Sequence, residues 1–158
     1  GHLDVIKYLL KNGSSTNERE SATGFTGLLL ASISGHLDII KYLLEHGSSI
    51  HEKALFGVSC LFIAVDKGNI KLIEYFIQKG CSVQDKFNSG DTCLLSSVRK
   101  NNLELVKYFL NNGSSICEKD KYGNTPLLVA SEGGHLDIVK YLLNRKSSIK
   151  EKNNVGST

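Results

Sequence analysis

Cysteine and histidine are the residues of this chain that could bind a metal or act as a catalytic nucleophile and base. The sequence contains no C-x-x-C pair, and none of its four cysteines lies near a histidine at the spacing of zinc ligands. Cys60 and Cys93 stand at the same place in successive copies of a repeat. Stacked helices lie about 8–10 Å apart, whereas disulfide partners need Cα atoms within about 7 Å. We therefore expect reduced, partly buried thiols in an intracellular, cytoplasmic protein.

Three histidines, His2, His36 and His135, each follow a glycine in the tetrapeptide Gly-His-Leu-Asp. Ligands of a metal ion must converge on one point, so residues one or more repeat units apart are better interpreted as the starts of helices. The chain also lacks a glycine-rich phosphate loop, an H-E-x-x-H helix and a G-x-S-x-G turn. We predict no catalytic site, no metal site and no cofactor in this chain.

A ten-residue stretch organises the rest of the sequence. GHLDVIKYLL occupies residues 1–10, GHLDIIKYLL residues 35–44 and GHLDIVKYLL residues 134–143, and diverged copies begin at Gly68 and Asn101. The starting positions 35, 68, 101 and 134 are each 33 residues apart. A fixed period of this length indicates one structural unit copied head to tail.

Each unit predicts two helices, as residues 21–53 show. A turn around Gly24 precedes Thr26, a residue type that caps helix N-termini. A short helix follows over residues 28–34, and a second helix, with apolar residues at three- and four-residue steps, runs from Leu37 towards Gly47. The later units have Ser59, Thr92 and Thr125 as the capping residue. Tyr8, Tyr42, Tyr75, Tyr108 and Tyr141 share one position of the second helix, and we interpret this ladder as packing.

The last unit departs from the others at both of its helices. Pro126 stands at the first helical position, where a missing N–H costs nothing. Lys146 replaces the glycine that ends the second helix elsewhere. A left-handed residue other than glycine should cost about 1 kcal/mol. We therefore expect the C-terminal edge of the array to be frayed.

The stretch GNTPLLVA at residues 123–130, followed by GHLDIVKYLL, resembles the ankyrin repeat, as does the 33-residue unit of a turn and two helices. The resemblance covers the whole chain as one array over residues 1–158, comprising a half repeat at 1–20, full repeats at 21–53, 54–86, 87–119 and 120–152, and a stub at 153–158. It implies an all-α solenoid of helix pairs with short, β-hairpin-like fingers. The family's TPLH histidine is absent, so apolar packing must replace its hydrogen bonds at Leu29, Phe62, Leu95 and Leu128.

Composition limits the classes of partner. The net charge of +3 is too small to indicate binding to nucleic acid or to an anionic membrane. The longest apolar run, residues 60–65, is far too short to span a membrane, and no secretory signal opens the chain. The chain begins with Gly halfway through a repeat, so we expect a segment of a longer protein.

The resemblance also implies a function, namely a non-catalytic scaffold that binds a partner protein through its fingers and the inner face of its first helices. The residues at these positions change from repeat to repeat while the helical framework is kept. The expected contact residues are Phe25, Ile33, Leu55, Phe56, Val58, Asp66, Lys67, Asn88, Asp91, Arg99, Lys100, Lys121, Tyr122, Asn124 and Glu132.

Two features of these positions have alternative interpretations. Leu55, Phe56, Val58, Phe87 and Tyr122 are apolar or aromatic residues in turns, so they either anchor a partner or are buried between neighbouring fingers. Lys67, Arg99 and Lys100 either meet an acidic partner or form part of a solvated face of mixed charge. The competing functions are a passive spacer, a stack that self-associates through uncapped terminal repeats, and the targeting arm of a larger enzyme or channel.

Overall fold

The computed structural model describes residues 1–87 and 89–158. It divides into two compact units, Gly1–Cys81 and Ser82–Thr158. Among the described residues the regular structure is helical, apart from one isolated antiparallel bridge between Lys53 and Ser59. This confirms the predicted all-α fold of repeated helix pairs. That the repeats form one array over residues 1–158 stays a prediction.

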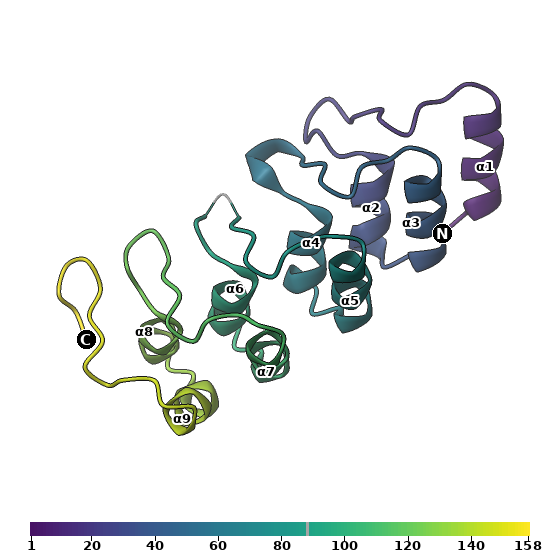
Figure 1. Ribbon diagram of the computed structural model, residues 1–158. Coiled ribbons are helices and arrows are strands. Elements are labelled where there is room, and N and C mark those ends of the chain that lie inside the picture. Colours follow the sequence, from purple (N-terminus) through teal and green to yellow (C-terminus); the bar gives the residue numbers. More distant parts are fainter. Residues whose placement is uncertain (88) are drawn as a thin grey trace. The chain divides into compact units, whose positions relative to one another are not determined.

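The first unit contains a lone helix followed by two helix pairs (Figure 1). Its elements are α1 (Leu3–Lys11), α2 (Gly27–Ser34), α3 (Leu37–Glu45), the short 3-10 turn η1 (Leu55–Gly57), α4 (Cys60–Asp66) and α5 (Ile70–Gln78). The first helix of each repeat packs against the second, α2 on α3 and α4 on α5. Neighbouring repeats meet through α2 and α4, and α1 packs against α3.

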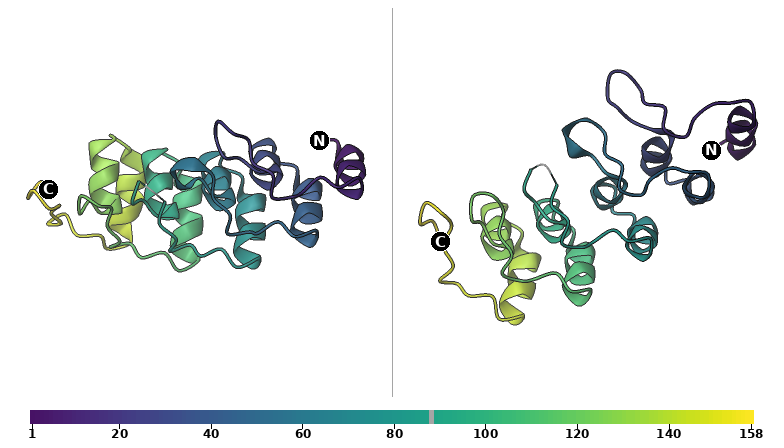
Figure 2. Two further views of the ribbon diagram at one scale, coloured as in Figure 1. Left: turned by 90° about the horizontal axis from the view of Figure 1, so that it is seen from above. Right: turned by 45° about the horizontal axis from the view of Figure 1, so that its top comes forward.

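The second unit repeats this arrangement with two helix pairs (Figure 2). Its helices are α6 (Cys93–Arg99), α7 (Leu103–Asn111), α8 (Pro126–Glu132) and α9 (Leu136–Asn144). Helix α6 packs on α7 and α8 on α9, while α6 contacts α8 and α7 contacts α9. Among the described residues of the chain, no helix has both the length and the apolar character that a membrane span requires.

The first helices begin at the hydroxyl residues that the sequence predicts. Thr26, Ser59, Thr92 and Thr125 each accept a hydrogen bond from the backbone N–H three residues on. Three of these hydroxyls also donate to a glutamate 26 residues later, in the pairs Thr26–Glu52, Thr92–Glu118 and Thr125–Glu151. One side chain therefore caps the first helix and holds the loop that leaves the second helix of the same repeat.

Apolar side chains occupy the four positions where the family's histidine is absent, and two of them are fully buried. Leu29 and Leu95 are fully buried, whereas Phe62 and Leu128 are half-buried. On the second helices, Lys7, Lys41 and Lys107 place Nζ 5.7–5.8 Å from the ring centroids of the following repeats' Tyr42, Tyr75 and Tyr141. The tyrosine ladder thus joins neighbouring repeats within each unit.

The second helices end in the left-handed conformation that their glycines predict. Gly47 has a φ of 103°, and Gly13, Gly80 and Gly113 also have positive φ. Lys146 takes the same conformation with a φ of 70°, although it carries a side chain. The last repeat therefore keeps the backbone of the others at a conformational cost.

Candidate partner-binding surface

The described residues form five short fingers, which precede the first helices or end the chain. They comprise residues 20–25, 54–58, 87 with 89–91, 120–124 and 153–157. A backbone N–H near the start of each finger donates across its base, as from Ala54 to Val58 at 2.8 Å and from Asp120 to Asn124 at 3.1 Å. The other three fingers close in the same way, through Glu20–Phe25, Phe87–Asp91 and Asn153–Ser157. Within each unit the fingers extend away from the helix pairs (Figure 2). They are hairpin-like turns, as expected.

Two pairs of neighbouring fingers are joined by main-chain hydrogen bonds. Leu55 N donates to Thr23 O at 3.1 Å in the first unit, and Asn154 N donates to Tyr122 O at 3.0 Å in the second. Arg19 strengthens the first of these junctions, because its Nη1 donates to Gly24 O and to Lys53 O, both at 2.9 Å. These hydrogen bonds hold the joined fingers in place relative to one another within each unit.

The first unit exposes apolar side chains on this surface. Phe56 is 87% exposed and its neighbour Leu55 51%, while Ile33 on α2 is 41% exposed. Phe25 and Val58 are half-buried at the bases of their fingers. Exposed groups of this size are the kind that anchor a protein interface.

Phe56 also has an unusual backbone. Its φ is 59° and its ψ is 20°, in the left-handed region that bulky residues rarely adopt. Residues held in this way cost about 1–3 kcal/mol and concentrate at functional sites. Packing offers no compensation here, because the side chain is almost fully exposed.

The remaining apolar fingertips differ from one another. Tyr122 in the second unit is 59% exposed, with Lys121 Nζ 5.0 Å from its ring centroid. Phe87 is only 8% exposed and belongs to the core of its unit. For Phe87, burial is therefore the correct interpretation and partner anchoring is wrong.

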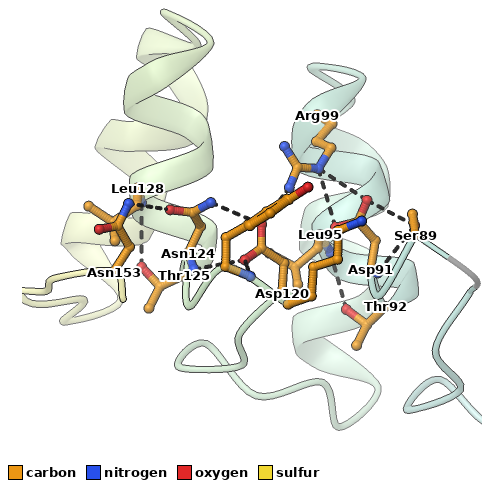
Figure 3. Close-up of polar contacts among 12 residues, drawn as sticks. Ser89, Asp91, Thr92, Leu95, Arg99, Asp120, Asn124, Thr125, Leu128 and Asn153 are labelled. Atoms are coloured by element: carbon orange, nitrogen blue, oxygen red, sulfur yellow. Dashed lines mark hydrogen bonds and ion pairs between the residues drawn. The ribbon is translucent and has the colours of Figure 1, made fainter. Parts of the chain in front are cut away.

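A polar cluster supports the fingers of the second unit (Figure 3). Arg99, at the end of α6, donates from Nε to Asp91 Oδ2 at 3.1 Å and from Nη2 to Asp120 Oδ2 at 2.6 Å. Ser89 Oγ donates to Asp91 Oδ2 at 3.2 Å. Both carboxylates are buried, with Asp91 8% and Asp120 6% exposed. Arg99 therefore links two successive fingers, and its charge is already paired.

Asp120 organises the finger that carries Tyr122. Its Oδ1 accepts the backbone N–H groups of Tyr122 and Asn124, each at 2.8 Å, and its Oδ2 accepts Asn124 Nδ2 at 3.0 Å. Burial acts to raise the pKa of Asp120, but the hydrogen bonds from Asn124 and Tyr122, together with the Arg99 charge, lower it below its usual value. Asp120 is therefore the acceptor that sets the conformation of this finger.

A groove lies beside the same finger. It has a volume of about 710 Å³ and is lined by Tyr122, Asn124, Leu128, Glu132 and Asn153, among others. Asn153 Nδ2 donates to Asn124 Oδ1 at 3.0 Å on its wall. The groove thus combines the exposed ring of Tyr122 with the aliphatic side chains of Leu128 and Val155 and with charged groups of both signs, Lys121 and Glu132.

The other expected contact residues fall into three groups. Lys67, Lys100, Lys121 and Glu132 are exposed, and Asp66 and Asn124 are half-buried. Asp91 lies under the fingers, paired with Arg99. Asn88 lies outside the described residues. Sequence reasoning missed Asp120 and Asn153, although an Asp or Asn at the first finger position is a signal for a side chain that bonds its own turn.

The described cysteines differ in burial, and burial changes the pKa of one of them. The four cysteines form no disulfide among the described residues, and Cys117 is the exposed one. Burial, with a smaller effect of Cys81, raises the pKa of the Cys60 thiol to about 12, so this group is a poor nucleophile. In the described part of the chain, no three or more His, Cys, Asp or Glu side chains are grouped so as to hold a metal ion.

The family model for ankyrin repeats (3 copies) matches residues 1–54 and 61–153. The chain therefore belongs to the ankyrin-repeat family. Ankyrin repeats are generally protein–protein interaction modules and generally non-enzymatic scaffolds. A comparison with curated proteins found no match to this chain.

Proposed function

We propose that this chain is a non-catalytic scaffold that binds a partner protein through its fingers and the adjoining first helices. The observation that carries the proposal is Phe56, a phenylalanine that is 87% exposed and held at a φ of 59°. Such a residue is unfavourable for stability in both respects, because its ring is left in water and its backbone is strained. Burial of the ring by a partner would recover the first of these costs.

The surface around Phe56 supports the same function. Leu55 and Ile33 add exposed apolar area in the first unit, and Tyr122 does so in the second. Aromatic anchors near the centre of an interface commonly contribute about 2 kcal/mol or more to binding. We infer a cytoplasmic setting with a protein as the partner, rather than nucleic acid or a membrane. This inference is supported by the small net charge and by four cysteines that form no disulfide among the described residues.

The proposal is tested by affinity capture from a cell extract followed by quantitative mass spectrometry. Wild type is compared with Phe56→Glu and Tyr122→Ala, and with the controls Lys71→Glu on α5 and Lys140→Ala on α9, which are exposed on second helices. We expect at least one protein to be lost roughly 30-fold from the fingertip variants but retained by the controls. The melting temperatures of the fingertip variants should not fall. Equal capture by wild type and both fingertip variants, at matched folding, would exclude this surface.

Self-association is the second candidate function, and a separate observation favours it. Tyr8 in α1 is 68% exposed, and Leu136 in α9 and Ile149 beyond it are 61% and 75% exposed. Exposed apolar side chains of this kind can pack against a second copy of the chain. Light scattering over a range of protein concentrations tests this function. A mass that rises with concentration, with no partner recovered from the extract, would favour it over the scaffold.

A further inference from the structure

The first unit has a small pocket between α3 and α5, the second helices of its two helix pairs. It has a volume of about 240 Å³ and is lined by Lys41, Leu44, Glu45, Ser48, Ile50, Tyr75 and Lys79. Helix α3 packs on α2 and α5 on α4, so this α3–α5 pocket belongs to two complete repeats. Sites for cofactors and drug-sized molecules commonly have volumes of about 300–1,000 Å³. The α3–α5 pocket is smaller and suits a single side chain.

Two lysines flank the half-buried tyrosine of this pocket. Lys41 Nζ lies 5.8 Å from the ring centroid of Tyr75, and Lys79 Nζ lies 5.7 Å from the same centroid. Burial, with a smaller effect of Glu45, raises the pKa of the Tyr75 hydroxyl, so this group remains a neutral O–H donor. Two ammonium groups and one phenol O–H therefore border the same small volume.

Ser48 adds a buried hydroxyl to these donors. It is 7% exposed, and its Oγ makes no hydrogen bond to any described residue of the chain. A buried hydroxyl without a partner costs free energy, and an acceptor bound in the pocket would offset this cost. Ser114 and Ser147 at the same position of later repeats are in the same state. The combination of this hydroxyl with two lysines distinguishes the α3–α5 pocket.

The cations that correspond to Lys79 in two other repeats are already engaged. His46 stacks on the tyrosine of its own repeat with ring centroids 3.9 Å apart. Arg145 Nη2 donates to Asn111 Oδ1 at 2.5 Å. Glu45 and Lys79 hold the places of Asn111 and Arg145, yet in the described part of the chain they form no ion pair with each other. The ammonium group of Lys79 can therefore bind a ligand without breaking an ion pair.

We propose that the α3–α5 pocket binds the carboxylate of an acidic side chain, Asp or Glu, from a partner polypeptide. Lys41 and Lys79 contribute two positive charges and Glu45 one negative charge, and a single carboxylate balances the excess. Its two oxygens accept several hydrogen bonds, which matches the ammonium and hydroxyl donors of the pocket. A phosphoryl group carries roughly two negative charges and is repelled more strongly by Glu45.

Leu44 and Ile50 give the pocket an apolar wall. Both side chains are half-buried. An aliphatic residue next to the acidic one in the partner would bury apolar area against them. The expected ligand is thus an exposed segment in which Asp or Glu stands beside a residue such as leucine. The pocket includes no residue of the fingers, so this site is additional to the proposed scaffold surface, and either proposal can fail without the other.

Two capped peptides test the proposal, acetyl-Ala-Glu-Leu-Ala-amide and its uncharged match acetyl-Ala-Gln-Leu-Ala-amide. Amide NMR spectra of the isotope-labelled whole chain measure their binding. We expect the signals of Ser48 and Lys79 to shift and saturate with the glutamate peptide at a Kd on the order of 1 mM. The glutamine peptide should bind roughly fivefold more weakly. Added sodium chloride should weaken binding of the glutamate peptide, because it screens the lysine charges.

Variants of the chain locate the site. Lys41→Gln and Lys79→Gln should each weaken binding of the glutamate peptide roughly threefold. Lys71→Gln removes the same charge near the start of α5 and should leave binding unchanged. Glu45→Gln should strengthen binding roughly threefold, because it removes a repulsive charge, whereas Asp38→Asn at the start of α3 should not. All five side chains are exposed, so the variants should keep the melting temperature of wild type.

Three results would overturn the proposal. The first is equal binding of the two peptides, or shifts that leave out Ser48 and Lys79. The second is a loss of affinity in Lys71→Gln as large as in Lys79→Gln, because that loss would reflect attraction to the overall charge of the chain. The third is tighter binding of acetyl-Ala-phosphoserine-Leu-Ala-amide than of the glutamate peptide, because this would assign the pocket to a phosphoryl ligand.

Discussion

Arg99 and Asp120 tie the end of α6 to the finger that precedes α8, with Nη2 donating to Oδ2 at 2.6 Å. The two residues are 21 positions apart, and Asp120 also accepts the backbone N–H groups of Tyr122 and Asn124. One ion pair therefore connects a helix to the backbone that presents an exposed tyrosine. Asp120 is 6% exposed, so the arginine compensates a carboxylate that has lost most of its water.

Replacement of Arg99 by Met should lower the free energy of unfolding by about 1–3 kcal/mol, because hydrogen bonds to buried charged groups are lost. Chemical denaturation of Arg99→Met, with Lys140→Met as the exposed control in the same unit, measures the change. A double-mutant cycle with Asp120→Asn should give a coupling energy above about 0.5 kcal/mol. Strict additivity of the two variants would show that the pair contributes nothing.

Glu118 should make the free energy of unfolding depend on pH. Burial raises the pKa of Glu118 above its ordinary value of 4.5, opposed by the hydrogen bond from Thr92 and more weakly by Lys86. The folded protein therefore keeps a proton at a pH where the unfolded chain has released it, and the free energy of unfolding falls as pH rises from 4.5 through the raised pKa.

Denaturation of wild type and Glu118→Gln at several pH values checks this direction. The variant should have a flatter profile above pH 4.5, since Gln does not titrate. Burial also raises the pKa of Glu52, so the slope should flatten further in Glu52→Gln combined with Glu118→Gln. Asp120 acts in the opposite sense, and its contribution is lost as pH falls below 3.8. Identical profiles for wild type and both variants would rule out a raised pKa at these sites.

Lys146→Gly should raise the free energy of unfolding by about 0.5–1 kcal/mol. Lys146 has a φ of 70°, a conformation that glycine adopts without a steric penalty. The matched control is Asn144→Gly in the last turn of α9, which should lower stability by up to about 1 kcal/mol. Thermal unfolding of both variants decides the sign, and destabilisation by Lys146→Gly would contradict the prediction.

Much of the fold could be predicted from the sequence because the residues that begin and end the helices recur from repeat to repeat. Thr26 and its counterparts cap the first helices, and Gly47 ends a second helix, because each effect is local to one turn of the chain. The same local rules explain why Lys146 adopts the conformation of the glycine it replaces.

The surface was less predictable, because burial depends on neighbours that sequence does not place. Phe56 and Phe87 are both phenylalanines in fingers, yet one is 87% and the other 8% exposed. They occupy different positions of the finger, with Phe56 at the tip and Phe87 at the base. Likewise, α1 and α3 have nearly the same sequence, but Val5 is exposed whereas Ile39 is buried in the helix α3, which packs on α2.

In the proposed function, Phe56 is kept for binding at a cost to stability. The variant Phe56→Gly tests it most directly, because glycine relieves a φ of 59° and removes the exposed ring. We predict that Phe56→Gly raises the free energy of unfolding by about 0.5–1 kcal/mol and weakens capture of the partner roughly 30-fold. Unchanged capture by the correctly folded variant would contradict the claim.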